Sequence, residues 1–376
     1  MLDLEFSEEQ DMLREAVGGL CDDKASIEAV RALENDEKGF DSDFWSQLSE
    51  LGITGALIPE EHGGSGMSLL DTVVAYEEFG RSLAPSPHLV SSVISAGVLA
   101  RIGSEAQQAA WLPPMASGEK IITPAWLEPE NSSGPSGVQM KVESSGDGFI
   151  LNGAKRHVFF ASSADAFLVL ARSAEGVELF LVPADTAGLT LSQQNSVAYD
   201  TQYRVDFDDV TVGADARIGD ATDGWATWHK AMLDACILVG ALSTGGARRV
   251  HEITAEYAKE RVQFDKPLAA FQSLNHYMAD SITEIDGART LVHQAAWARD
   301  TLRGVDKLAP MAKMFATEVY RKASGMAIQI HGGMGFTVEC DAQLYFRRAK
   351  SFELNWFDTD HLEELIAAQV LDADLH

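Results

Sequence analysis

The chain has 376 residues, 46% of them hydrophobic and 23% charged, a composition typical of a globular protein with two or three domains. Its net charge of −28 and the lack of a basic run argue against nucleic acid or a membrane surface as a partner. Three scattered cysteines without a CxxC pair indicate a reducing compartment, so we expect a cytoplasmic protein without a metal site. The opening "MLDLEFSEEQ" lacks the regions of a secretory signal, and no apolar run reaches the roughly 20 residues that span a bilayer.

Helical periodicity dominates residues 1–120. Ser7 and Gln10 have the spacing of a capping box at a helix start. A later helix is predicted to have one apolar face, made by Phe44, Leu48 and Leu51. The Gly-rich stretch 57–68 contains neither GxGxxG nor a Walker lysine, so it is not a phosphate-binding loop by its spacing.

The period changes to two between about residues 121 and 217. Gly, Asp and Ser turns separate short β-like runs at 149–153, 165–172, 177–184 and 203–212. In the last run, Tyr203, Val205 and Phe207 alternate with charged residues, which is the pattern of a half-buried antiparallel strand.

Long helical segments return after about residue 222. The periodicity predicts helices over 225–264, 270–303 and 307–330, and Pro310 suits the first turn of the third. Long helices joined by short loops favour an antiparallel bundle. The predicted order is therefore helices, a β-domain and a helical bundle.

Three segments carry a family resemblance. The stretches "ERVQFDKPLAAFQ" (260–272), "QIHGGMGFT" (329–337) and 51–87 resemble the acyl-CoA dehydrogenases, in the family's order and at its separations. The resemblance implies FAD as cofactor, oxidation of the α,β bond of an acyl-CoA thioester, and an electron-transfer flavoprotein as acceptor. It also implies an α+β, mostly α fold with an N-terminal helical domain (1–120), a middle antiparallel β-barrel domain (121–220) and a C-terminal four-helix bundle domain (221–376).

One half of the family's cofactor site is kept. In the family, FAD lies across a subunit boundary, and one subunit reaches over with R-x-x-F and Q-x-x-G-G motifs to hold the diphosphate and adenine end. The positions that the resemblance implies for these contacts are Arg261, Gln263, Phe264, Gln272, Gln329, Gly332 and Gly333. An arginine fork suits diphosphate oxygens, and glycines allow close approach of backbone to a cofactor. Asp265 departs from the family's usual glycine and adds a negative charge.

The half that holds the flavin ring is eroded. The family's Thr-Glu-Pro loop aligns with "LEPENSSGPSG", in which Leu127 replaces the threonine. His157 stands for a family tryptophan, and Phe159 stands for the threonine that faces the flavin. Because phenylalanine has no donor for the flavin edge, we expect this half of the site to bind a flavin ring weakly. We interpret His157 as a half-buried strand histidine rather than a catalytic residue.

The carboxylate that serves the family as base is also missing from its two positions. The family removes the α-proton of the thioester with a carboxylate in a dry site. Counting from Gly333, the late glutamate position falls on Trp356, and counting back from Arg261, the early position falls on Ala235. Asp234 is adjacent, but one residue turns a helical side chain by roughly 100°, so it should face elsewhere. No catalytic residue is therefore assigned.

Our main hypothesis is a subunit of a heteromeric FAD-dependent acyl-CoA dehydrogenase whose paralogous partner carries the base. The sequence resembles the degenerate subunit of the bacterial α2β2 enzymes of steroid or cholesterol side-chain catabolism, including the "RRAK" and "DTDH" signatures. Two alternatives stay open. One is a homotetrameric dehydrogenase with a displaced base, Glu353 or Asp358, in the aromatic stretch "SFELNWFDTD". The other is a non-catalytic scaffold or CoA-ester-binding protein without flavin.

Overall fold

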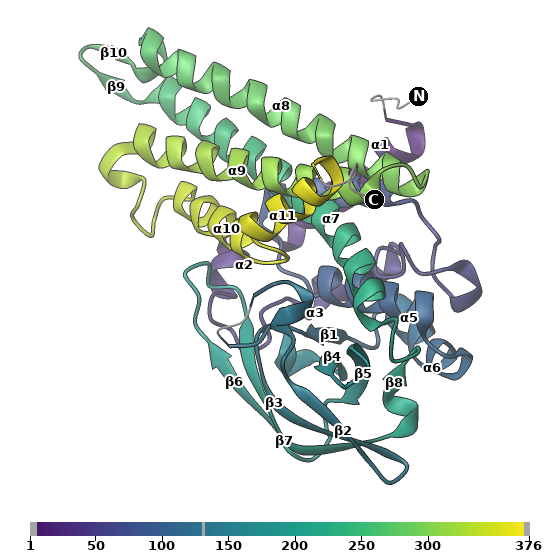
Figure 1. The fold of residues 1–376 in the computed structure, drawn as a ribbon. Coiled ribbons are helices and arrows are strands. Elements are labelled where there is room, and N and C mark those ends of the chain that lie inside the picture. The colour runs from purple at the N-terminus through teal and green to yellow at the C-terminus, as the bar shows by residue number, and fades with distance from the viewer. Residues whose placement is uncertain (1–5, 130–131, 372–376) are drawn as a thin grey trace. The chain divides into compact units, whose positions relative to one another are not determined.

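The computed structural model describes residues 6–129 and 132–371, and the chain forms two compact units (Figure 1). The bundle unit comprises Met1–Arg31, Leu69–Ala84 and Cys236–His376. The sheet unit comprises Ala32–Ser68 and Pro85–Ala235. Each unit therefore combines segments that are distant in the sequence.

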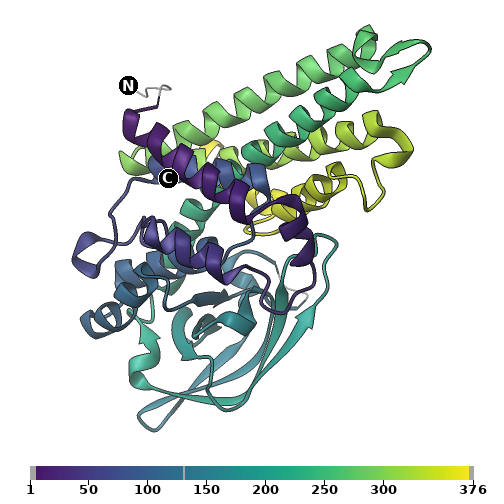
Figure 2. The ribbon, with the colours of Figure 1, turned by 180° about the vertical axis from the view of Figure 1, so that it is seen from behind.

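The bundle unit is helical. Its helices are α1 (Glu8–Lys24), part of α2 (Ile27–Ala32), α4 (Leu69–Ser82), most of α7 (Gly224–Glu260), α8 (Gln272–Asp300), α9 (Val305–His331), α10 (Ala342–Leu354) and α11 (Thr359–Val370). α4 packs on α1 and α8, while α9 packs on α8, α10 and α11 (Figures 1 and 2). The predicted capping box at Ser7 and Gln10 is confirmed at the start of α1.

Glycines in α7 allow its close packing in the bundle. A Cβ atom on Gly240 would lie 2.9 Å from Val292 of α8, and one on Gly245 would lie 2.0 Å from the carbonyl oxygen of Glu77 of α4. By composition α7 is long and apolar enough to cross a bilayer, contrary to our expectation, but 89% of that apolar window is buried inside the protein. We therefore describe α7 as a core helix.

The predicted helix over 225–264 is wrong at its end. α7 stops at Glu260, and a hairpin follows, with β9 (Val262–Gln263) antiparallel to β10 (Lys266–Pro267). The Leu268 amide donates to the Arg261 carbonyl at 2.8 Å, which closes the hairpin and replaces the helical ladder.

Two smaller predictions were also wrong. Leu51 is 41% exposed, because α3 (Ser42–Glu50) has already ended before it. Pro310 lies in the second turn of α9 rather than the first, because the helix begins at Val305, after the left-handed Gly304.

The sheet unit is built around eight strands. They are β1 (Ile122–Ala125), β2 (Lys141–Ser145), β3 (Gly148–Phe159), β4 (Ala166–Arg172), β5 (Val177–Pro183), β6 (Leu189–Gln194), β7 (Gln202–Gly213) and β8 (Arg217–Ile218). The order is β6-β7-β3-β2-β4-β5-β8, with β1 paired to β4. The pairing is antiparallel except between β1 and β4 and at the single Lys141–Arg172 pair of β2 and β4, so the expectation of a fully antiparallel sheet needs this correction.

Helices accompany the sheet within this unit. They are α3, a π-helical segment (Leu89–Ser95), α5 (Ala96–Ile102), α6 (Glu105–Ala116) and the first turns of α7. The alternation predicted for β7 is confirmed, since Tyr203, Val205 and Phe207 are buried in the core of the sheet. Leu151 of β3 and Phe180 of β5 belong to the same core.

Candidate functional site

The two predicted cofactor motifs meet at one end of the bundle unit. The ring of Tyr257, one helical turn before Arg261, stacks on the ring of His331 with centroids 4.2 Å apart. His331 directly precedes Gly332, so this contact joins the end of α7 to the end of α9. The β9–β10 hairpin and the turn after α9 lie at the same end of the bundle in both views (Figures 1 and 2).

All the predicted contact residues are exposed on this end. They are Arg261, Gln263, Phe264, Gln272, Gln329, Gly332 and Gly333. Phe264 is 86% exposed, and in the turn after α9 Phe336 is 73% exposed and Val338 is 72% exposed. Large exposed apolar side chains at one end of a bundle suit an interaction surface.

The backbone of this end has two features that sharpen the assignment. Phe264 and Asp265 have φ angles of 54° and 63°, as the two-residue turn between paired Gln263 and Lys266 requires. A Cβ atom on Gly333 would meet no other atom within 4 Å, and Gly333 does not have a positive φ. Among the described residues, no contact or backbone angle requires glycine at 333, and the space beside its Cα is open.

The positions aligned with the flavin-ring site lie in the sheet unit. His157 is half-buried at a bulge of β3, with a φ of 52°. Its Nδ1 lies 2.7 Å from Oε1 of Gln202, and its amide donates to Oε1 of Gln194 at 2.9 Å. Phe159 is 9% exposed and contributes only carbon atoms from its side chain. The structure thus places His157 as the half-buried strand histidine that we expected.

The acidic residue of the "LEP" loop serves a buried ion pair. Glu128 accepts from Nζ of Lys155 at 2.8 Å and from the amides of Gln139 and Met140 at 3.0 and 2.9 Å. Burial lowers the pKa of Lys155 to about 8, although the Glu128 charge opposes that shift. Residues 130–131 of this predicted loop lie outside the described residues.

Neither aligned base position carries a carboxylate. Trp356 and Phe357, in the loop between α10 and α11, are 6% and 0% exposed. Ala235 is fully buried in α7, and its neighbour Asp234 is bound to Arg101, with Oδ2 and Nη2 separated by 2.6 Å.

Both candidates for a displaced base are engaged in structural contacts. Glu353 accepts from Nε of Arg321 at 3.1 Å and from Nζ of Lys350 at 2.7 Å. Asp358 caps α11 by accepting from the amide of His361 at 2.9 Å. Glu353 is therefore paired with two cations, and Asp358 serves as a helix cap.

Sequence reasoning missed two side chains beneath this loop. Nζ of Lys313, in the middle of α9, donates to the carbonyl oxygen of Phe357 at 2.7 Å. Sγ of Cys236 lies 3.6 Å from the carbonyl oxygen of Trp356. The available signal was the position of Lys313 on the buried alanine face of α9, where a charged residue needs an explanation.

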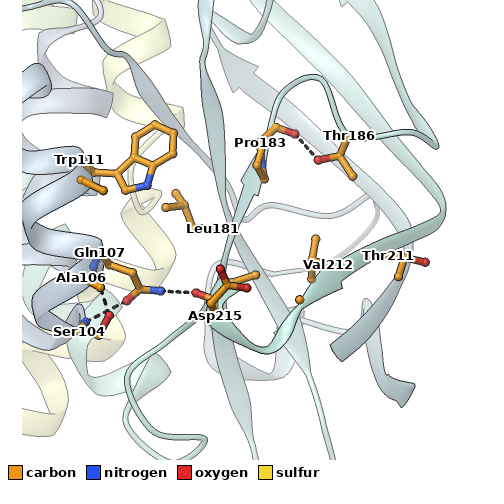
Figure 3. A pocket seen from close by; sticks show the side chains of 13 residues that line it. Ser104, Ala106, Gln107, Trp111, Leu181, Pro183, Thr186, Thr211, Val212 and Asp215 are labelled. Carbon is orange, nitrogen blue, oxygen red and sulfur yellow. Dashed lines mark hydrogen bonds between the residues drawn. The ribbon is translucent and has the colours of Figure 1, made fainter. Parts of the chain in front are cut away.

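A pocket of about 600 Å³ lies apart from these positions, within the sheet unit. Figure 3 shows Trp111 and Gln107 of α6 on one side and Pro183 and Val212 of the sheet on the other. The Gln107 side chain donates to the carbonyl oxygen of Asp215 at 2.8 Å. Because this pocket contains none of the predicted site residues, we do not assign the cofactor or the substrate to it.

Family models match most of the chain. Those described as the acyl-CoA dehydrogenase N-terminal, middle and C-terminal domains match residues 7–119, 124–210 and 222–369. The chain therefore belongs to the acyl-CoA dehydrogenase family, whose members are FAD-dependent oxidoreductases that act on the CH–CH bond of acyl-CoA thioesters. The predicted fold class, with helical terminal domains and a middle β-domain, is confirmed.

Individual relatives span nearly the whole chain. The probable acyl-CoA dehydrogenase YngJ of Bacillus subtilis is 32% identical over 98% of this chain and 100% of its own length. A chain of the ChsE4–ChsE5 complex from Mycobacterium tuberculosis matches with a TM-score of 0.90 at 29% identity, covering 99% of this chain and 100% of that one. Butyryl-CoA dehydrogenase from Megasphaera elsdenii matches with a TM-score of 0.90 at 26% identity, covering 98% and 100%.

Proposed function

We propose that this chain is one subunit of a heteromeric acyl-CoA dehydrogenase and donates FAD contacts to a paralogous subunit that carries the base. The observation that carries this proposal is an asymmetry. The residues that would hold another subunit's FAD lie exposed together at one end of the bundle unit. The position that would face a flavin of this chain's own holds Phe159, whose side chain cannot donate a hydrogen bond to the flavin edge. The two aligned base positions hold Trp356 and Ala235, neither of which can act as a base.

Each donated residue has a distinct role in this proposal. The Arg261 guanidinium would bind diphosphate oxygens through charge-assisted hydrogen bonds. The exposed ring of Phe264 would pack on the cofactor, and the amide side chains of Gln263, Gln272 and Gln329 would offer donors and acceptors. The open space beside Gly333 would let its backbone approach the cofactor closely.

The chemical step would lie on the partner. When bound, FAD supplies an acceptor for the hydride that leaves the β-carbon of the thioester, and the partner's carboxylate would take the α-proton. This chain would orient the cofactor rather than move a proton. We further propose a cytoplasmic α2β2 assembly that passes electrons to an electron-transfer flavoprotein. By its resemblance, the acyl group would be a steroid or cholesterol side chain.

Co-expression with sequence-related subunits tests this assignment. The complex should oxidise an acyl-CoA with a soluble electron acceptor, whereas the chain purified alone should not. Substituting the partner's catalytic carboxylate should abolish that activity. Full activity of the chain alone would contradict the proposal, and a complex without flavin would favour the scaffold alternative.

The displaced-base alternative makes a separate prediction. Because Glu353 is bound by Arg321 and Lys350, Glu353→Gln should leave kcat/KM of the complex within about twofold of wild type. Loss of a true general base lowers the rate by about 10²–10⁴-fold. A loss of that size in Glu353→Gln, or in the matched Asp358→Asn, would support a displaced base instead.

Asp265 offers a gain-of-affinity test. Glycine accepts its φ of 63° without steric cost, and removing the charge four residues after Arg261 should favour an anionic cofactor. Asp265→Gly should therefore tighten FAD binding to the complex by about two- to fivefold at low salt. The gain should shrink at high salt because mobile ions screen exposed charges. Unchanged or weaker binding at low salt would argue that Asp265 does not face the cofactor.

A further inference from the structure

The loop between α10 and α11 has a backbone conformation that its side chains oppose. Trp356 and Phe357 have φ angles of 59° and 69°, a region that bulky residues rarely adopt. Among the described residues, the other adjacent non-glycine pair with this property is Phe264–Asp265, where a two-residue hairpin turn requires it. No hairpin explains the pair at 356–357. Such a conformation persists only where surrounding contacts hold it.

The contacts that hold it come from beneath the loop. Nζ of Lys313 donates to the Phe357 carbonyl oxygen at 2.7 Å, and Sγ of Cys236 lies 3.6 Å from the Trp356 carbonyl oxygen. The Phe357 ring meets the ring of His361 edge-on, with centroids 4.5 Å apart. The carbonyl groups of both left-handed residues are thus bound by side chains of α9 and α7.

Lys313 is poorly explained as a stabilising residue. Its side chain is fully buried, and within the described part of the chain its one hydrogen-bond partner is the Phe357 carbonyl. Burial lowers its pKa to about 8, although charges on Cys236, Asp358 and Glu353 oppose that shift. A buried ammonium with a single acceptor is unfavourable compared with an apolar side chain of the same length. The placement of this ammonium on the Phe357 carbonyl points to a role in fixing the loop.

We propose that Lys313, assisted by Cys236, is the positioning residue that sets the backbone at 356–357 and holds the Trp356 ring inward. This loop occupies the place where the family resemblance puts the catalytic glutamate. We call this contact between Lys313, Cys236 and the 356–357 backbone the lock. It goes beyond the proposed function, because all its residues lie in this chain and it does not depend on a partner or on flavin. It also implies that Trp356→Glu alone would place a carboxylate on a backbone that Lys313 still controls.

Trp356 fluorescence in the full chain tests the lock. The signal of Trp356 among seven tryptophans is obtained by subtracting the spectrum of the matching Trp356→Phe variant. Lys313→Met removes a charge-assisted hydrogen bond, so the population of molecules whose Trp356 ring has left its buried position should rise about tenfold. This change would be seen as red-shifted emission and greater acrylamide quenching. The control is Lys322→Met, which removes an exposed lysine of the same helix and should change neither. A folded Lys313→Met variant with wild-type Trp356 emission and quenching would overturn the proposal.

If Lys313→Met does not fold, the pH dependence of Trp356 quenching in the unmodified protein tests the proposal. Neutralising Nζ replaces a charge-assisted hydrogen bond with a weaker one, so Trp356 quenching should rise with a midpoint near pH 8. The groups that face Lys313 and the loop are Cys236, Glu353, Asp358 and His361. Cys236→Ala removes the thiol from the titration and, because the Cys236 charge raises the pKa of Lys313, should move the midpoint to lower pH without abolishing it. A flat profile through this range would contradict the lock.

Discussion

Replacing Arg261 with alanine should weaken FAD binding by the heteromeric complex about 10- to 100-fold. Hydrogen bonds to charged groups contribute about 1.5–3 kcal/mol, and each 1.4 kcal/mol is about tenfold in affinity. The Arg261 side chain is exposed at the end of the bundle unit and is positioned by the turn that closes the β9–β10 hairpin. Arg261→Lys should recover part of the loss, because an ammonium keeps the charge but not the bidentate fork.

The measurement is flavin affinity of the purified complex, with activity assayed at limiting and at saturating FAD. Activity of Arg261→Ala should return at saturating FAD, since the proposed assignment puts the chemical groups on the partner. The matched control is Arg303→Ala, in the turn at the opposite end of α8, which should bind FAD normally. Equal FAD affinity of Arg261→Ala and the wild type would refute a diphosphate contact.

Replacing Glu77 with alanine should destabilise the bundle unit by about 3 kcal/mol, since removing one partner of a buried ion pair leaves the other uncompensated. Glu77 is 6% exposed and accepts from Nε and Nη2 of Arg289 at 2.7 and 3.0 Å and from Nε2 of His293 at 2.9 Å. The Phe6 ring stacks on His293 and lies under the Arg289 guanidinium, so the same cluster fastens the chain before α1 to α8. Urea unfolding measures the effect.

The matched control is Glu252→Ala. Its partner Arg249 lies 3.4 Å away, and both side chains are more than a third exposed, so the change should be below about 1 kcal/mol. A loss in Glu77→Ala no larger than that of the control would show that the cluster contributes little to stability.

The Glu77 effect should also depend on pH in one direction. Burial alone would raise the pKa of Glu77, but the His293 hydrogen bond and the Arg289 charge outweigh it and hold the pKa below 4.5. The folded state therefore binds this proton less tightly than the unfolded chain. The stabilisation is fully present above pH 4.5 and is lost as the pH falls through the lower folded pKa. The difference in the free energy of unfolding between wild type and Glu77→Ala should therefore become smaller in acid.

Much of the fold followed from local patterns. The capping box at Ser7, the alternation along β7 and the long apolar stripes of α8 and α9 each reflect side chains a few residues apart, which a single sequence displays directly. The end of α7 could not be predicted in this way, because it depends on the hydrogen bond from the Leu268 amide to the Arg261 carbonyl. Phe264 and Asp265 also lack the Asn-Gly signature that announces a two-residue hairpin.

The candidate site was less predictable, because its contacts join distant positions. Lys313 and Phe357 are 44 residues apart, and Cys236 and Trp356 are 120 apart, so no spacing rule connects them. Ion pairing of Glu353 by Arg321 across helices likewise has no local signal. The alignment of motifs assigned Trp356 to the base position, and the structure adds what surrounds that residue.

The central claim is best tested by counting FAD per chain in the protein purified alone and in complex with its paralogous partner, from the flavin absorbance after denaturation. We expect a colourless chain alone and one FAD for each pair of unlike subunits in the complex. One FAD per chain in the protein alone, together with oxidation of an acyl-CoA, would contradict it.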